Sequence, residues 1–197
     1  GVIGCEYASI FNALGTQVHL VDTNSQIMSN ADPDISEFIK NAFYSVGIHV
    51  IPSSRYFSHK LQNDGVLTEL STGDIKTDIV LLAVGREPYT NNLNLGATDI
   101  ALDQKGYISI NSNACTNVPN IYAVGDIGTR NVPSDLSLVH VAEAEGRRAA
   151  AHILGIEGRQ GLDHTPYIVF TIPMLSGAGF NETYSREQFG KIRVGKY

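Results

Sequence analysis

The sequence predicts an α/β protein built on open, mostly parallel β-sheets, and three stretches point to this class. Residues 1–22 read as a tight turn, a helix and a strand. Residues 79–84, Ile-Val-Leu-Leu-Ala-Val, are continuously apolar, which is typical of a strand buried on both faces of a parallel sheet. Residues 120–127, Asn-Ile-Tyr-Ala-Val-Gly-Asp-Ile, read as a short strand ending in a glycine and a carboxylate. Because ligands bind at the carboxyl ends of strands in such sheets, Asp126 marks a candidate site.

Composition narrows the class of function. The chain has 197 residues, enough for one or two domains, and 43% of them are hydrophobic, as in an ordinary globular core. It carries 14 basic and 20 acidic residues, a net charge of −6, and its only basic pair is Arg147-Arg148. We therefore expect small-molecule partners, with no nucleic acid and no membrane. Without a membrane-length apolar run or a secretory leader, the expected location is the cytoplasm.

The two cysteines do not form a recognisable redox or metal motif. Cys5 and Cys115 lie far apart, without C-x-x-C or metal-ligand spacing, so no metal site is expected. Cys5 falls near the start of a predicted helix, where a thiol can become reactive, but a small buried side chain is the favoured interpretation. Cys115 is interpreted as a structural residue.

The N-terminal stretch carries a nucleotide-binding pattern. Gly1-Val-Ile-Gly4 leads into an amphipathic helix that ends at Gly15, like the last part of a G-x-G-x-x-G turn. The strand 17–22 follows and ends in Asp22, near the spacing at which an acid meets the adenosine ribose. A purely structural β–α–β unit is the alternative. An Asp22 carboxylate would repel a 2′-phosphate, and no Lys or Arg occurs before Lys40, so NAD is favoured over NADP.

The middle of the chain reads as one more helix and several strands. A helix is expected to begin at Asp32-Pro33-Asp34 and to run to Gly47, because acids and an early proline suit a helix N-terminus. Expected strands are 47–51, 55–60, 66–70 and 76–84, with turns at Asn63-Asp64-Gly65 and Thr72-Gly73-Asp74.

The second half is predicted to be less regular. The strand ends in Gly85-Arg86-Glu87-Pro88, and residues 89–118 are loop-like around a short strand at 107–110. A helix is expected to open near Asp135. Its predicted apolar face comprises Leu136, Val139, Ala142, Gly146, Ala149 and Ile153, and its predicted solvated face comprises Glu143, Glu145, Arg147 and Arg148. Gly146 would be costly inside a helix, which suggests close contact with a neighbour.

Taken in order, these motifs resemble the pyridine nucleotide-disulfide oxidoreductases. This FAD family includes dihydrolipoamide dehydrogenase, glutathione reductase, mercuric reductase and soluble pyridine nucleotide transhydrogenase. Residues 83–88 resemble its A-x-G-R-x-P hinge, 120–127 its second flavin motif, and 136–147 the helix that faces the flavin. Residues 170–182 resemble the F-T-x-P start of its dimerisation domain, although Met174 stands where dihydrolipoamide dehydrogenases often have glutamate.

The resemblance implies three regions: an NAD-binding Rossmann-like three-layer domain at 1–87 lacking its first strand, a returning segment of the FAD-binding domain at 88–160, and the start of an α+β dimerisation domain at 161–197. The expected NAD contacts are Gly1, Val2, Ile3, Gly4, Glu6, Asp22, Tyr56 and Gly85. The expected FAD contacts are Asp126, which would hold the ribityl chain, and Ser137, Leu138, Val139 and His140. For His140, packing beside the flavin is favoured over proton transfer.

By the same resemblance the chain is an interior fragment, inactive alone, that lacks the first flavin motif, the C-x-x-x-x-C disulfide and the C-terminal His-Glu pair. No catalytic side chain is therefore expected within it. The intact protein is expected to be a homodimer that passes hydride from NADH to FAD and on to a disulfide or small-molecule acceptor. The alternatives are a soluble pyridine nucleotide transhydrogenase and a freestanding nucleotide-binding or redox-sensing module without catalysis.

Overall fold

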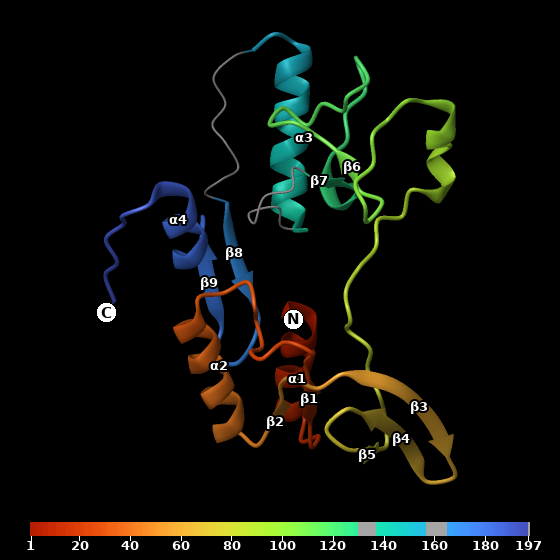
Figure 1. The fold of residues 1–197 in the computed structure, drawn as a ribbon, viewed down its shortest axis with the longest axis vertical. Coiled ribbons are helices and arrows are strands. Elements are labelled where there is room, and N and C mark those ends of the chain that lie inside the picture. Colours follow the sequence, from red (N-terminus) through yellow and green to blue (C-terminus); the bar gives the residue numbers. More distant parts are fainter. Residues whose placement is uncertain (130–136, 157–164, 197) are drawn as a thin grey trace. The chain divides into compact units, whose positions relative to one another are not determined.

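A computed structural model describes residues 1–129, 137–156 and 165–196 (Figure 1). The chain divides into two compact units. The first consists of Gly1–Gly85 together with Ile168–Ser176 and Asn181–Thr183. The second consists of Arg86–Tyr167 together with Gly177–Phe180 and Tyr184–Tyr197. The predicted NAD contacts therefore fall in the first unit and the predicted FAD contacts in the second.

The first unit opens with two helices that alternate with two parallel strands. These elements are α1 (Val2–Ala13), β1 (His19–Val21), α2 (Pro33–Ser45) and β2 (His49–Ile51). β1 and β2 pair in parallel with His19 opposite His49, as expected for a β–α–β arrangement. Helix α2 begins where the sequence predicts, with Asp32 as its N-cap and Pro33 in the first turn.

The core of this unit lies between α2, β2 and α1. Phe43 and Ile39 of α2 and Ile48 next to β2 are at most 1% exposed, and Cys5 of α1 is 0% exposed. The expectation of a buried Cys5 is thus confirmed. Ser36 is also buried, and its hydroxyl donates a hydrogen bond to the carbonyl of Ile27 at 2.5 Å. A polar group inside this apolar core is therefore satisfied.

A three-stranded antiparallel sheet completes the first unit (Figure 1). Its strands are β3 (Tyr56–Gln62), β4 (Gly65–Leu70) and β5 (Ile75–Thr77). The predicted turns between them are confirmed. Gly65 is required at the first turn because its φ is +138° and a Cβ there would lie 2.6 Å from the Thr77 carbonyl oxygen.

The apolar run 79–84 is not the buried strand that the sequence predicts. Strand β5 ends at Thr77, and the side chains of Ile79 and Val84 are 82% and 84% exposed. Among the described residues none pairs with this run in a sheet. An apolar sequence favours burial, but a strand is formed only when a neighbour supplies hydrogen bonds, and that neighbour is not found in the described part of the chain.

The second unit contains three short 3₁₀ turns, two short strands and one long helix. Its elements are η1 (Asn91–Leu93), η2 (Leu95–Ala97), β6 (Ile108–Ser109), η3 (Gly125–Ile127), β7 (Gly128–Thr129) and α3 (Val139–Ile153). β6 and β7 pair in parallel. The predicted strand at 120–124 is wrong: Tyr122 makes a single antiparallel bridge to Cys115 there, and the regular pairing begins after the turn at β7.

Helix α3 differs from its prediction in its start and in its buried face. It begins at Val139 rather than near Asp135, and residues 130–136 lie outside the described residues. Val139 and Ile153, placed on the apolar face by the sequence analysis, are 87% and 63% exposed. Glu145 and Arg148, placed on the solvated face, are 7% and 8% exposed. Ala149 of the predicted apolar face is buried, so the observed buried face overlaps the predicted one and is shifted toward Glu145 and Arg148.

Of two other expectations for α3, one is confirmed and one is not. Glu143 and Arg147 do form the expected exposed ion pair one turn apart. Gly146, by contrast, has no neighbour among the described residues within 4 Å of the position that a Cβ would take, so the suggested close contact is not found there.

The C-terminal stretch forms strands β8 (Pro166–Val169) and β9 (Leu175–Ala178), which pair with each other, and helix α4 (Glu182–Phe189). The helix predicted at 185–189 therefore begins three residues earlier, and the strand predicted at 191–194 does not form. Within the described ranges, no helix has the length and apolar character needed to cross a bilayer, and no three His, Cys, Asp or Glu side chains are grouped as metal ligands.

Candidate functional site

The first candidate site is the N-terminus of α1. Gly1 precedes the helix, and no side chain of the described residues caps it. The carbonyl of Gly1 accepts the N–H of Cys5, the first bond of the helix. The peptide N–H groups of Val2, Ile3 and Gly4 are the donors that a helix leaves unsatisfied in its first turn. Such a terminus, positive at the end of the helix dipole, suits an anionic group.

Asp22 is fixed beside this helix start. One of its carboxylate oxygens lies 3.1 Å from the nitrogen of Gly1, and the other accepts the backbone N–H of Asn24 at 2.9 Å and its side-chain amide at 3.1 Å. Only 11% of the Asp22 side chain is exposed. The acid that the sequence placed about 20 residues after the glycine turn thus lies beside that turn, because β1 packs against α1.

Gly4 sits where the helix packs against neighbouring chain. A Cβ on Gly4 would lie 3.6 Å from Leu20 Cδ1 and 3.7 Å from Ala83 Cβ, which is ordinary van der Waals contact. Directly after it, Cys5 is fully buried, and this burial raises the pKa of its thiol to about 11. Cys5 is therefore a packing residue of the turn and not a reactive thiol.

The other predicted NAD residues make local contacts in the first unit. Glu6 accepts the backbone N–H of Phe170 at 2.8 Å. The hydroxyl of Tyr56 lies 2.6 Å from Nδ1 of His59. Gly85 has a φ of +127°, a conformation that favours glycine at the exit of the run 79–84.

The second candidate site is the turn that carries Asp126. Asp126 lies in η3, and its carboxylate pairs with the guanidinium of Arg86 at 2.5 Å. Both side chains remain accessible, 42% exposed for Asp126 and 57% for Arg86. The sequence places Arg86 at a strand exit and in the hinge-like motif at 83–88, and its position beside Asp126 was not predicted.

Glu145 of α3 fastens this turn to the helix. Its carboxylate accepts the backbone N–H of Gly125 at 2.7 Å, although the side chain is almost fully buried. Gly125 has a φ of +74°, and a Cβ there would lie only 3.3 Å from the Cβ of Ala142. The sequence held a usable signal, because Glu145 lies four residues from both Val141 and Ala149, on the buried stripe of the helix.

The start of α3 lies in the same unit. Leu138 is its N-cap, in extended conformation, and no described side chain caps the helix. Leu138 also supplies the carbonyl that accepts the N–H groups of Val141 and Ala142. The imidazole of His140 donates from Nε2 to the carbonyl of Pro166 at 2.6 Å, so this ring has a structural partner. Ser137, directly before Leu138, is exposed.

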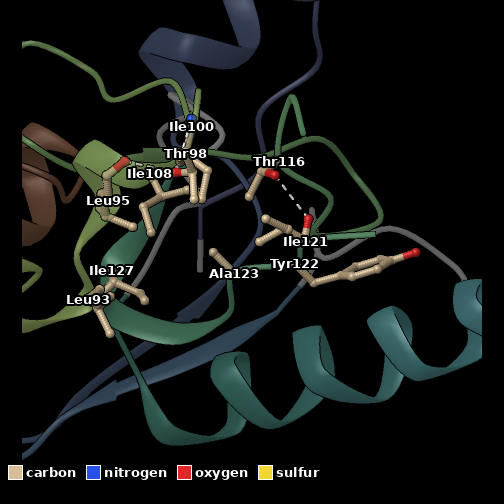
Figure 2. Close-up of a pocket in the computed structure, with 10 residues that line it drawn as sticks. All are labelled: Leu93, Leu95, Thr98, Ile100, Ile108, Thr116, Ile121, Tyr122, Ala123 and Ile127. Carbon is tan, nitrogen blue, oxygen red and sulfur yellow. Dashed lines mark hydrogen bonds between the residues drawn. The ribbon is translucent and has the colours of Figure 1, made fainter. Parts of the chain in front are cut away.

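A hollow of about 360 Å³ lies among η1, η2, β6 and the chain before η3 (Figure 2). Aliphatic side chains line most of it. Its two threonines donate their hydroxyls to backbone carbonyls of its own wall: Thr98 to Leu95 at 2.8 Å, and Thr116 to Ile121 at 3.0 Å. The hollow has no charged lining residue and so does not suit a dinucleotide.

Comparison with known proteins identifies the family. The sequence profile described as pyridine nucleotide-disulphide oxidoreductase matches residues 1–146. The chain belongs to this family. This result confirms the predicted family and its α/β fold class.

Named relatives of this chain span two kinds of enzyme. It is 33% identical over 197 residues to dihydrolipoyl dehydrogenase of Chlamydia muridarum, covering 100% of the chain and 41% of the relative. It is 38% identical over 185 residues to soluble pyridine nucleotide transhydrogenase of Aliivibrio fischeri, covering 92% and 38%. The chain therefore spans about two fifths of the length of the curated relatives it matches.

Solved structures of similar fold include LpdA from Mycobacterium tuberculosis, with a TM-score of 0.83 and 27% identity over 95% of the chain and 40% of that protein. The HOCl-induced flavoprotein disulfide reductase RclA from Escherichia coli gives a TM-score of 0.82 at 26% identity, covering 98% and 44%. These names agree with the predicted oxidoreductase class and with the predicted cofactors FAD and NAD.

Proposed function

We propose that the chain is part of an FAD-dependent oxidoreductase, similar to dihydrolipoamide dehydrogenase, that oxidises NADH and passes the electrons to a disulfide or a related small-molecule acceptor. The observation that carries this proposal is the position of Asp22, whose side chain is 11% exposed, beside the first turn of α1 in a chain of this family. When bound, the two cofactors would supply the hydride transfer itself.

The residues around α1 fit the adenosine half of NAD. Peptide N–H groups of Val2, Ile3 and Gly4 would donate to the pyrophosphate, and the dipole of α1 would stabilise its charge. Asp22 would accept hydrogen bonds from the ribose hydroxyls, held in place by its contacts with Asn24. Glu6, Tyr56 and Gly85 complete the proposed NAD site.

Asp22 would also select against a 2′-phosphate, because two negative groups would meet in a site that leaves little of the acid exposed to water. The next basic residue along the chain, Lys40, is paired with Glu37 at 2.6 Å. The charge of Lys40 is thus paired within α2 and does not neutralise a 2′-phosphate beside Asp22. We expect NADH to be preferred over NADPH for this reason.

The residues around η3 fit a flavin with its sugar-alcohol chain. Asp126 would accept hydrogen bonds from ribityl hydroxyls, because its carboxylate is accessible while the turn beneath it is held by Glu145. The first-turn N–H groups of α3, around Leu138, Val139 and His140, would donate to the electron-rich edge of the flavin ring. Ser137 belongs to the same proposed contact set.

The test is flavin content and cofactor preference in the full-length protein that contains this chain. Purified protein should be yellow, and it should oxidise NADH at least about tenfold better than NADPH in kcat/KM, a gap of about 1.4 kcal/mol. Asp22→Ser should narrow that ratio, whereas the matched Asp34→Ser, on the exposed start of α2, should leave it unchanged. Equal rates with NADH and NADPH in the unmutated protein would contradict the role given to Asp22.

A second candidate function is transfer of hydride between two nicotinamides, favoured by the 38% identity to the Aliivibrio fischeri transhydrogenase. It requires that a nucleotide with a 2′-phosphate be accepted as well. The same rate measurement separates the two, because a transhydrogenase of NADPH and NAD would show substantial NADPH oxidation despite Asp22.

A further inference from the structure

Three reactive side chains meet at the last turn of α3, and none belongs to the cofactor sets proposed above. The sulfur of Cys115 lies 3.6 Å from Nδ1 of His152, and the hydroxyl of Tyr122 lies 2.8 Å from the same nitrogen. The rings of Tyr122 and His152 also meet edge-on, with centroids 5.8 Å apart. We call these three residues, Cys115, Tyr122 and His152, the thiol cluster.

The backbone holds the thiol cluster in place from two sides. Cys115 and Tyr122 lie opposite each other in an antiparallel bridge, and this backbone pairing places their side chains next to each other. The side-chain carbonyl of Asn111 accepts the N–H groups of Asn113 and Cys115, which fixes the turn that presents the sulfur. Figure 2 shows the ring of Tyr122 extending away from the aliphatic lining residues of the hollow, and the ring reaches His152 at its hydroxyl end.

Of the two cysteines of the chain, Cys115 is the more exposed. Cys115 is half-buried and His152 is exposed on the surface of α3. Cys5 is 0% exposed, and burial raises its thiol pKa to about 11. The thiol of Cys5 is therefore unreactive and can serve as an internal reference for the reactivity of Cys115.

The cluster has the parts of an assisted nucleophile. A neutral imidazole nitrogen can take the proton of a neighbouring thiol, and the resulting imidazolium stabilises the thiolate beside it. Partial burial and a hydrogen bond with Cys115 raise the pKa of Tyr122, so its phenol keeps its proton and remains a donor to the cluster. A thiolate with two donors beside it and access to solvent suits reaction with a small oxidant.

We propose that Cys115 is a site of reversible oxidation by hydroperoxides, with His152 as the base that activates its thiol. The phenol of Tyr122 turns its O–H from Nδ1 of His152 to the sulfur, the thiol proton moves to the freed Nδ1, and the sulfur of Cys115 attacks one peroxide oxygen. The S–O bond forms as the O–O bond breaks, and the departing hydroxide or alkoxide takes the proton back from His152 to leave as water or an alcohol. Sulfur loses two electrons to give a sulfenic acid, and the hydroperoxide gains them. An external thiol would reduce the product.

The test uses the full-length protein and measures each cysteine separately by peptide mass spectrometry. The protein is treated with hydrogen peroxide and dimedone, and the rate of sulfenic acid labelling is followed at Cys115 and Cys5. We expect labelling at Cys115 to exceed that at Cys5 by at least about tenfold. His152→Ala should lower the Cys115 rate by about a hundredfold, the smaller end of what a positioned base contributes. Added imidazole should restore part of the loss, which a merely structural role for His152 would not allow.

The matched control is His59→Gln, which removes another exposed histidine that is paired with a tyrosine but has no cysteine. It should leave the Cys115 rate unchanged. If His152→Ala exposes Cys5 to labelling, the variant is misfolded, and Tyr122→Phe, which removes only the phenol donor, takes its place with an expected decrease at Cys115. Equal labelling of the two cysteines in the unmutated protein, or a Cys115 rate insensitive to both substitutions, would overturn the proposal.

Discussion

Replacing Glu145 should loosen the turn that carries Asp126. The Glu145 side chain is almost fully buried, and its carboxylate accepts the N–H of Gly125 at 2.7 Å. A hydrogen bond to a charged group contributes about 1.5–3 kcal/mol, and a buried donor left without its acceptor costs a similar amount. We therefore expect Glu145→Ala to lower the free energy of unfolding by about 2–3 kcal/mol.

Glu145→Gln keeps an acceptor oxygen of similar reach and loses only the charge. Its expected cost is about 1 kcal/mol, the difference between a charged and a neutral hydrogen bond. The matched control is Glu143→Ala on the same helix, which removes an exposed ion pair with Arg147. A pair of this kind contributes at most about 0.5 kcal/mol.

The assay is urea unfolding of the full-length protein, followed by circular dichroism, together with the dissociation constant of FAD. The loss in free energy of unfolding should be smallest for Glu143→Ala, larger for Glu145→Gln and largest for Glu145→Ala. FAD affinity should fall in the same order, because the turn that presents Asp126 loses its support. If Glu145→Ala and Glu143→Ala were equally mild, Glu145 would not be holding the turn.

Two further predictions concern individual residues. Gly125→Ala places a Cβ 3.3 Å from that of Ala142 at a φ of +74°, so thermal unfolding should show a loss of about 1–2 kcal/mol. Gly155→Ala, at a φ of +67° with no described atom within 4 Å of the added Cβ, should lower the stability less than Gly125→Ala does. Equal losses for the two variants would rule out crowding against Ala142 as a cause. Cys5 should make the protein sensitive to alkali, because burial raises its thiol pKa from 9.0 to about 11. Its contribution is complete below pH 9.0 and is lost as the pH rises to about 11, roughly 2–3 kcal/mol in all, and Cys5→Ala should flatten this part of the stability curve.

Local signals in the sequence predicted the parts of the fold that depend on neighbouring residues. Asp32 and Pro33 specify the start of α2, and the Asn63-Asp64-Gly65 turn specifies the β3–β4 hairpin, because caps and turns are set within a few residues. Asp22 was found at the first site because the distance from glycine turn to strand end is fixed by the β–α–β unit itself.

Features that depend on distant contacts were missed. The run 79–84 is apolar enough for a core strand, but strand formation needs a partner that sequence cannot locate. Arg86 pairs with Asp126, which lies 40 positions later in the sequence, and no periodic signal predicts this pairing. Glu145 was assigned to solvent by its charge, although its spacing from Val141 and Ala149 placed it on the buried stripe. Spacing was the better guide there than residue type.

The most direct test of the account is a crystal structure of the full-length protein with its flavin. It should show an oxygen of Asp126 within about 3.2 Å of a ribityl hydroxyl, the range of a hydrogen bond, with Glu145 still on the N–H of Gly125. A structure in which Asp126 remains paired with Arg86 and makes no contact with the ribityl chain would contradict the proposed flavin site. A protein that binds no flavin would contradict it as well.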